Sequence, residues 1–518
     1  MERSQVFAGC VTCGLSRRSF LTGCAGCAAA VMAGAGVLRA AEGGGKVKIR
    51  VVYSLHAPKQ PGPDWPNVGF DFGPVMQRID AALAKGCAGF EFVSSMAKGP
   101  DDAKTILEAD KGAGIDGYLV YQMNCWNQVV QTIAGSGKPV LYADFQYGGS
   151  GGFLVYAAAF LRAKAENLGF VASSKFQDVV AAVKCFEEVK KSGAAGQFAG
   201  LVAKARGGAT PKPGDLACKA DELKVLSPEE CLKQMKQSRI LAVGGTQSGP
   251  AGEMMAIPVV NVAFAEVNEA WKNADRDQCK EVADRWERTA AKVEGVKRET
   301  LETSAAMYLG MKAVLKKYGA NAITMNCLGG FYGGHIHAYP CLGFHELNNE
   351  GLVGACECDL RSTATMVAFG AMTQGRPGYI SDPVIDTSKR QIIYAHCVAS
   401  NRVFGPKGQT NPFQILTHSE DRQGASVRSI VPVGYMTTTL EILPGQKEIL
   451  IHLAKAVEND PDDRACRTKI GAEPVGDIEK LFTQWDRYGW HRVTFYGDLK
   501  KPAYGLAEVM GWKVVEEA

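Results

Sequence analysis

The amino-acid sequence predicts an α/β protein with two Rossmann-like α/β domains, each with a parallel sheet, followed by a mainly β C-terminal domain. Short apolar runs alternate with helical stretches over much of the chain, and β-type runs replace this pattern beyond about residue 352. A chain of 518 residues is long enough for about three domains. We expect an N-terminal α/β domain over 42–171, a second over 172–351 and the β domain over 352–518.

The two α/β domains are predicted from short buried strands that alternate with helices, a pattern typical of βαβ units. The strand-like runs occur at 48–53, 117–121, 139–142, 239–243, 258–262 and 322–326, and the helical stretches at 75–85, 126–133 and 267–318. The glycine-rich loop at 148–152 lacks the spacing of a dinucleotide-binding loop, and the loop at 244–249 lacks the lysine of a P-loop. A bound dinucleotide cofactor is therefore not expected.

The third domain is predicted from apolar β-type runs at 391–396 and 492–496, with glycine–proline and asparagine–proline turns between them. One segment of this domain, 448–457, reads as a helix, and its His452 is expected to be structural.

Composition and charge exclude several classes of protein. Charged residues make up 22% of the chain and hydrophobic residues 46%, as in ordinary globular proteins. The net charge is +4, and most of the surplus lies within residues 1–41, so the rest of the chain is close to neutral. A nearly neutral body gives no reason to expect a nucleic acid as partner. Beyond the first 41 residues no apolar run is long enough for a stable membrane span.

Residues 1–41 resemble an export signal of the twin-arginine type. Arg17 and Arg18 are followed by Ser-Phe-Leu, a weakly apolar stretch and then small residues at 40–41. This order predicts export by the twin-arginine route to the periplasm or another extracytoplasmic compartment.

Residues suited to chemistry concentrate in the second half of the chain. Seven of the eight histidines lie from His335 onward. Glu357 and Asp359 follow a short apolar run, so they are expected at the end of a strand, where α/β proteins place ligand groups. In an extended strand the two carboxylates share one face. They could bind a cation, or they could form ion pairs, for example with Arg361.

Other polar clusters follow in the chain. The segments 394–396, 401–402 and 417–422 are dense in hydrogen-bonding side chains, which suits a polyol ligand but also a charged β surface. His335 and His337 have the spacing of a metal pair, but in a loop they are as well suited to face solvent.

Two segments resemble the superfamily of fucose isomerases and arabinose isomerases. One is 355–359 with the Thr-Ala-Thr at 363–365, and the other is 489–498 with the closing helix before Trp512. The resemblance implies a divalent metal, Mn²⁺ or else Mg²⁺ or Zn²⁺, bound by Asp359, His491 and Glu357 between the second and third domains. It also implies assembly into trimers or hexamers. Oxygen-rich ligands with one imidazole suit manganese or magnesium.

The sequence departs from this family at one position. In fucose isomerases a metal-binding and catalytic glutamate begins the helix before the carboxylate strand, and here that position falls near Cys341. Either Glu357 or Glu346 supplies the second carboxylate, or this branch does different chemistry. We expect catalytic roles for Glu357, Asp359 and Glu346, and assign the proton transfer to Glu357 ahead of Glu346. A thiolate at Cys341 would favour zinc.

The sequence therefore predicts a metal-dependent aldose–ketose isomerase that acts on a free sugar. Such an enzyme moves a proton between C1 and C2 through an ene-diol, which requires a base, an acid and an electrophile. The alternative is an exported carbohydrate-binding protein that keeps the fold without the chemistry.

The export signal can be tested directly. Changing Arg17 and Arg18 together to lysine should leave the precursor in the cytoplasm, because the signal is read through its arginine pair. Fractionation of cells that express each form measures this, and an unchanged periplasmic yield would contradict the assignment.

Overall fold

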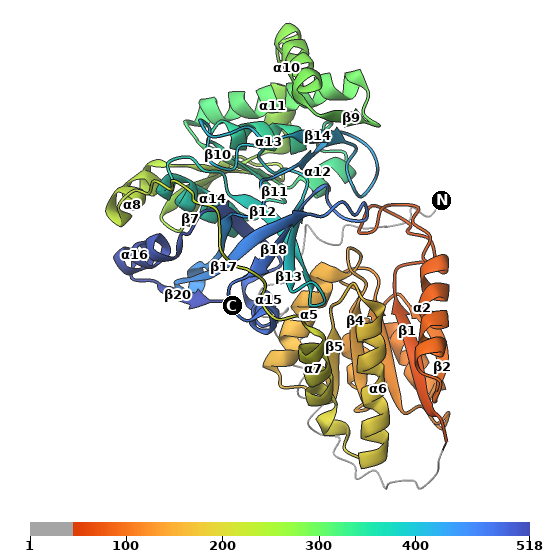
Figure 1. Cartoon of the computed structure of the whole chain (residues 1–518). Coiled ribbons are helices and arrows are strands. Elements are labelled where there is room, and N and C mark those ends of the chain that lie inside the picture. The colour runs from red at the N-terminus through yellow and green to blue at the C-terminus, as the bar shows by residue number, and fades with distance from the viewer. Residues whose placement is uncertain (1–44) are drawn as a thin grey trace.

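The computed structural model describes residues 45–518 as a mixed α/β protein (Figure 1). The N-terminal part has a parallel, Rossmann-like sheet, a second sheet follows, and the C-terminal part is mostly β and forms an antiparallel barrel. The predicted fold class is confirmed. The predicted export signal lies outside the described residues. Within residues 45–518, no helix combines the length and apolar character that crossing a membrane requires.

The first sheet has five parallel strands in the order β2-β1-β3-β4-β5. Every residue of the inner strands β3 and β4 is buried, because the crossover helices of a parallel sheet cover its faces. The strands are β1 (Val47–Ser54), β2 (Phe90–Ala97), β3 (Gly117–Gln122), β4 (Val140–Asp144) and β5 (Leu168–Val171). The helices are α2 (Gly73–Gly86), α3 (Pro100–Ala109), α4 (Val129–Ala134), α5 (Ser150–Arg162), α6 (Phe176–Ser192) and α7 (Phe198–Ala209).

The second sheet has the order β11-β10-β6-β8-β7 and is parallel except for β7. Its last strand in the chain, β11, comes after residue 352, so sheet pairing crosses the boundary expected there. The strands are β6 (Ile240–Val243), β7 (Gly249–Met254), β8 (Ile257–Val262), β10 (Ala322–Met325) and β11 (Val353–Cys356). The helices are α8 (Pro228–Gln237), α9 (Phe264–Lys272), α10 (Arg276–Thr289), α11 (Arg298–Tyr318), α12 (Cys327–Tyr332) and α13 (Cys341–Asn349).

The barrel is a closed cycle of six antiparallel strands in the order β16-β19-β12-β13-β18-β17, with β17 pairing back onto β16. Closure removes the free edges of the sheet. The strands are β12 (Tyr379–Asp386), β13 (Gln391–His396), β16 (Met436–Leu443), β17 (Glu448–Asn459), β18 (Thr468–Pro474) and β19 (Arg492–Tyr496). The helices of this part are α14 (Leu360–Met372), α15 (Trp485–Tyr488) and α16 (Lys500–Met510).

One further strand joins the barrel sheet, and a separate small sheet completes the fold. The strand β20 (Lys513–Glu516) pairs in parallel with β17. A small sheet joins β9 (Lys292–Glu294) from the second part to β14 (Phe413–Leu416) and β15 (Ser426–Ser429). The helix predicted over 448–457 is wrong, because these residues form β17, whose apolar side chains pack into the core.

The N-terminal part packs against the barrel through a shared apolar core. Phe170 of β5 lies 4.8 Å, between ring centroids, from Phe482. The guanidinium of Arg206 lies over the Phe170 ring at 3.8 Å and forms an ion pair of 2.6 Å with Glu479. This contact sets where loops of the N-terminal part meet the barrel.

A buried ion cluster ties the C-terminal strand to the barrel. Glu517 accepts hydrogen bonds from Arg492 at 2.7 Å and from His452 Nδ1 at 2.9 Å, and all three side chains are inaccessible to solvent. Burial alone raises the pKa of Glu517, but the charge of Arg492 and the hydrogen bond from His452 outweigh burial and lower it to about 2. His452 has a structural role, as predicted, although it lies in a strand and not in the predicted helix.

This cluster predicts an acid-dependent stability. The folded pKa of Glu517 lies below its ordinary value of 4.5, so its contribution is complete above that value and is lost as the pH falls towards about 2. Glu517→Gln should lower the free energy of unfolding at neutral pH by about 3 kcal/mol. It should also make the free energy of unfolding fall less steeply as the pH is lowered. Denaturant unfolding at several pH values measures both effects. Glu508→Gln, at an exposed position of α16, is the control and should behave as the wild type.

Candidate metal centre

Four ionisable side chains converge at one point of the described structure. The ligand atoms of Glu357, Asp382, His396 and His491 all lie within 4.8 Å of one another. Two carboxylates and two imidazoles form the donor set. Both histidines are buried and both carboxylates are partly buried.

The strands of the barrel bring three of these side chains together. Asp382 belongs to the central strand β12, which pairs with β13 on one side and with β19 on the other. His396 is the last residue of β13, and His491 directly precedes β19. The pairings Asp382–Ala395 and Ser381–Arg492 place Asp382 between the two histidines. The register of β12 with β13 and β19 therefore brings these three side chains together.

Glu357 reaches the centre from the second sheet. The strand β11 ends at Cys356, and Glu357 and Cys358 then adopt left-handed conformations, with φ of 64° and 55°. Such conformations are strained for non-glycine residues and persist where the surrounding structure enforces them. The prediction that Glu357 and Asp359 share one face of an extended strand is wrong, because this turn separates them.

Asp359 lies behind His491. One of its oxygens caps α14 by accepting the backbone N–H groups of Arg361 and Ser362. The other accepts the Nδ1–H of His491 at 3.0 Å. Burial alone raises the pKa of Asp359, but the hydrogen bond and charge of His491 hold it well below its usual range. Asp359 thus fixes the tautomer that points Nε2 of His491 at the other three donors.

The donor atoms suit a divalent cation. His491 Nε2 lies 3.3 Å from Asp382 and 3.5 Å from Glu357, and His396 Nε2 lies 3.7 Å from each carboxylate. Neither Nε2 atom makes a hydrogen bond, although both are buried. Buried imidazole nitrogens without partners, aimed at carboxylates, are what a bound metal ion would satisfy. Mixed carboxylate and imidazole donors suit Mn²⁺, Fe²⁺ or Zn²⁺.

The charges of the four groups are mutually dependent. Burial alone would lower the pKa of both histidines, but Glu357 and Asp382 outweigh it and raise the pKa of His396 and His491. In return the histidines lower the pKa of Glu357 against the effect of its burial. A cation at this point would take the place of the protons on the imidazoles.

Glu346 and Arg361 lie outside this centre. Glu346 accepts hydrogen bonds from Arg285 at 3.0 Å and from the indole of Trp286 at 2.8 Å, so it joins α13 to α10. Arg361 lies in the first turn of α14, where its guanidinium approaches Gly489. Gly489 has a φ of +81°, and a Cβ there would lie 2.4 Å from that guanidinium. Glycine therefore permits the turn that leads into His491.

A loop of the N-terminal part faces the centre. The ring of Trp126 lies 5.3 Å from that of Trp490, which lies 5.5 Å from the His491 ring. Trp126 has a left-handed φ of 62°. The backbone N–H of Val68 donates to the carbonyl of Glu420 at 2.7 Å. Groups from two parts of the chain therefore meet beside His491 and Glu420.

Glu420 is a further carboxylate close to the candidate metal centre. It lines one cavity together with Glu357 and His396 and accepts a hydrogen bond from the Tyr332 hydroxyl at 3.3 Å. Burial raises the pKa of Glu420 well above its ordinary value, and the nearby charges of Asp64 and Glu357 raise it further. Glu420 is therefore suited to carry a proton at neutral pH. It lies in the segment 417–422 that the sequence singled out for a polyol ligand.

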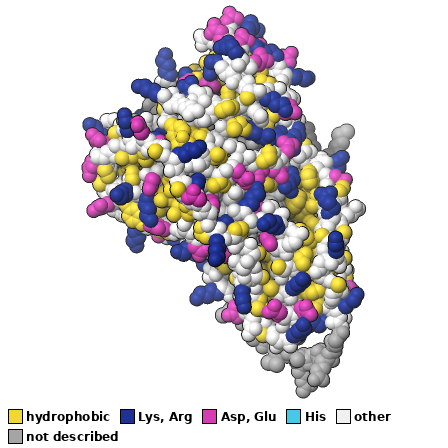
Figure 2. Space-filling view, viewed as in Figure 1, with side chains coloured by type: hydrophobic (Ala, Val, Ile, Leu, Met, Phe, Trp, Pro, Cys, Tyr) yellow, Lys and Arg dark blue, Asp and Glu magenta, His cyan; other side chains and the backbone are white. Residues whose placement is uncertain are grey.

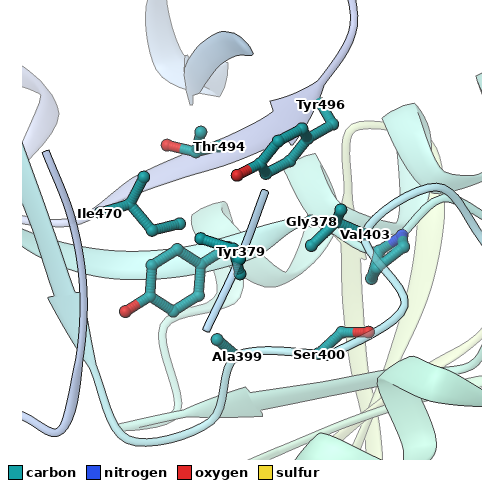
Figure 3. A pocket seen from close by; sticks show the side chains of 10 residues that line it. Gly378, Tyr379, Ala399, Ser400, Val403, Ile470, Thr494 and Tyr496 are labelled. Atoms are coloured by element: carbon teal, nitrogen blue, oxygen red, sulfur yellow. The ribbon is translucent and has the colours of Figure 1, made fainter. Parts of the chain in front are cut away.

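Three other features within residues 45–518 are partnered or face solvent. A cavity of about 10 Å³ is lined by Tyr379, Tyr496 and smaller residues, among them Ser400 and Thr494 (Figure 3). Both tyrosine hydroxyls already donate to backbone carbonyls, those of Thr468 and Pro432. On the face shown in Figure 2, basic and acidic side chains are interspersed. His335 and His337 are exposed and lie in contact with aromatic rings.

Of these four side chains, the sequence predicts Glu357 and His491 as site residues but not Asp382. His396 lies in a polar cluster for which the sequence predicts no metal role. A charged residue inside the apolar run 379–386 is the signal that points to Asp382. The proline next to it argues against a central strand and hides that signal.

Comparisons with known proteins give partial matches. No protein-family model matches the chain. Sulfoquinovose isomerases of Priestia aryabhattai and Priestia megaterium are each 24% identical over 196 residues, 36% of this chain and 44% of the relative. That of Alkalicoccus urumqiensis is 23% identical over 220 residues, 42% of this chain and 49% of the relative. The chain spans about half the length of the curated relatives it matches.

Solved structures add little. A sugar ABC transporter structure from Yersinia enterocolitica shares 11% identity, covers 54% of this chain and 65% of its own, and has a TM-score of 0.16, too low to support an argument. The sequence relatives are sugar isomerases, the class of enzyme to which the resemblance in the sequence also points.

The arrangement predicts how metal content depends on each side chain. His491→Ala and Asp382→Ala should each lose most of the bound divalent metal, because each removes a donor from the centre. Asp359→Asn should bind about 10- to 100-fold more weakly, because it only misorients His491. Metal analysis by plasma mass spectrometry after dialysis measures occupancy. His337→Ala, at an exposed histidine, should keep wild-type content, and wild-type content in all four variants would place the metal elsewhere.

Proposed function

We propose that the protein is a metal-dependent aldose–ketose isomerase that acts on a free monosaccharide. The observation that supports it most is the convergence of Glu357, Asp382, His396 and His491 beside a carboxylate suited to carry a proton. The partial similarity to sulfoquinovose isomerases supports the same reaction class. Export by the twin-arginine route and assembly into trimers or hexamers belong to this proposal as expectations of the sequence.

In this proposal the four converging residues hold one divalent cation, with manganese as the first choice. Such an ion, held by these four side chains, would supply electrophilic stabilisation of the negative charge that develops on the sugar oxygens. Asp359 keeps His491 in the orientation that this requires, through the 3.0 Å hydrogen bond to Nδ1.

The protein supplies the proton transfer through two carboxylates. Glu357, whose pKa is low, is the base that removes a proton from the carbon next to the carbonyl. Glu420, whose pKa is raised and which lines a small cavity together with Glu357, is the acid that would protonate a sugar oxygen bound beside it. Carboxyl groups with pKa values shifted in opposite directions are a usual basis for such a division of roles.

The sugar itself is proposed to lie between the barrel and the N-terminal part. Trp126 and Trp490 offer apolar ring faces near His491, against which the C–H face of a sugar ring can pack. The sugars tested as substrates should include sulfoquinovose, the sugar in the name of the relatives, together with neutral hexoses and pentoses.

The proton-transfer role of Glu357 can be tested in deuterated water. Glu357→Gln keeps the shape of the side chain and removes the base, so deuterium incorporation at C2 should slow by about a hundredfold or more. Mass spectrometry of the sugars measures incorporation, and metal content is measured in parallel. Glu346→Gln is the matched comparison and should exchange at the wild-type rate when folded, because Glu346 pairs with Arg285.

Two outcomes would contradict the proposal. Near wild-type exchange in metal-loaded Glu357→Gln would remove Glu357 from the proton transfer and leave Glu420 as the remaining candidate. Binding of a sugar without exchange in the wild type, across the panel, would identify a carbohydrate-binding protein instead.

A further inference from the structure

One histidine lies far from the others along the chain. His56 belongs to the N-terminal part, whereas the other seven histidines begin at His335. It follows β1, which ends at Ser54. Its Nε2 atom lies 3.2 Å from a carboxylate oxygen of Asp64, and the two side chains are 20% and 25% exposed. We call these two residues the His–Asp pair. Because both are partly exposed, a ligand can reach them.

The His–Asp pair lies where the first sheet reverses its strand order. The strand β2 pairs with one edge of β1, and β3 pairs with the other edge. The loops that follow β1 and β3 therefore leave neighbouring strands at the same end of the sheet. In open α/β sheets, ligands bind outside this end at the point of reversal. The pair thus occupies the position at which this class of fold binds small molecules.

Asn124, from the loop after β3, holds both members of the pair. Its side chain is fully buried. It accepts the backbone N–H of His56 at 3.0 Å, and it donates to the Asp64 carboxylate at 3.5 Å and to the carbonyl of Trp65 at 3.2 Å. A buried amide with all these partners fixes the segment that it contacts. The His–Asp pair is therefore held in place by the fold.

The loop that carries the pair docks beside the candidate metal centre. Trp65 is buried in the apolar core that the second sheet shares with the barrel. Asn67 accepts a hydrogen bond from Arg422 at 2.6 Å. These contacts bring Asp64, the neighbour of Trp65, to the segment that also carries Glu420.

The charge of Asp64 acts on groups around the candidate metal centre. Burial raises the pKa of Glu420 most, and the charge of Asp64 comes next, ahead of that of Glu357. Burial also raises the pKa of the Cys125 thiol well above its ordinary value, and the charges of Asp64 and Asp382 raise it further. Such effects fall off with distance. The His–Asp pair and the metal centre therefore lie near the same side chains.

The proposed isomerisation leaves one chemical task without a residue. A free pentose or hexose is mostly a closed ring, in which C1 is a hemiacetal carbon and not a carbonyl. The ene-diol step needs the open chain. Opening the ring requires that a proton leave the O1 hydroxyl and that the ring oxygen O5 receive one. The four converging side chains and Glu420 already have other roles in the proposed function.

We propose that His56 opens the sugar ring before isomerisation and that Asp64 positions it, an inference that rests on the proposed function. With Nε2–H donated to Asp64, Nδ1 of the neutral imidazole carries the lone pair. Nδ1 takes the proton from O1, the C1=O1 double bond forms, and the C1–O5 bond breaks with its electron pair on O5. The same nitrogen then gives the proton to O5, so no proton is gained or lost. One imidazole can serve both oxygens because both are bonded to C1.

Ring opening can be measured apart from isomerisation. Metal-loaded Glu357→Gln lacks the base for the C–H proton and keeps His56, so it should exchange the α and β anomers of a sugar faster than buffer does. Adding His56→Gln should slow the catalysed exchange by about a hundredfold or more. Glutamine can still donate to Asp64 but cannot take up a proton. NMR of each hexose or pentose, dissolved as a single anomer, measures the rate.

The controls separate this role from the metal centre. His337→Gln, at an exposed histidine, should leave anomer exchange unchanged. His56→Gln should keep wild-type metal content, because His56 is not one of the four donors. Anomer exchange that survives His56→Gln, or its absence in Glu357→Gln, would overturn the inference. If no sugar exchanges deuterium at C2 in the wild type, the proposed function fails, whereas anomer exchange that depends on His56 would still support the ring-opening role.

A second substrate distinguishes ring opening from a merely structural role. Glyceraldehyde is too short to form a sugar ring, so its exchange at C2 does not need the His–Asp pair. His56→Gln and Asp64→Asn should each lower the exchange of a hexose relative to that of glyceraldehyde, His56→Gln by about a hundredfold or more. Equal losses for both substrates would contradict the inference, because they would indicate damage to the whole site.

Discussion

The pairing of β12 with both β13 and β19 is the constraint on which the candidate metal centre depends. It holds Asp382 between His396 and His491, while closure of the barrel through β16 and β17 leaves this part of the sheet no free edge at which to shift register. A slip of one residue would turn Asp382 to the opposite face of the sheet. Because buried ionisable groups are costly without partners, any such slip would leave charges uncompensated. The register and the charge balance therefore support each other.

The sequence predicts nine of the twenty described strands, those whose apolar runs are short and bounded by turns. The runs at 48–53 and 391–396 match β1 and β13 closely. Among the strands that the sequence does not predict is β2, an edge strand with several exposed or half-exposed residues, because its pattern carries little of the signal of a buried strand. The segment that forms β17 reads as a helix in the sequence, since its apolar and polar residues fit the helical period as well as the strand period. Barrel packing, a tertiary effect, decided between them.

The site was partly predictable for a different reason. Glu357 and His491 lie in segments that resemble a known family, so their importance followed from local sequence. The positions of Asp382 and His396 follow from antiparallel register between distant strands, which one sequence does not specify. The orientation of Glu357 follows from two left-handed residues in succession, although strand alternation would point it elsewhere. Local pattern thus indicated which residues matter, and long-range pairing determined how they meet.

The wide spacing of the donors along the chain has a consequence for how the protein folds. Glu357 follows the second sheet, whereas His491 directly precedes β19, one of the last strands of the barrel. Contacts between residues so far apart in sequence form late in folding, because the entropy cost of closing a long loop comes before the contacts stabilise the chain. An ion at this centre can therefore stabilise only the nearly finished fold. It would slow unfolding of the native state and would not speed the early steps of folding.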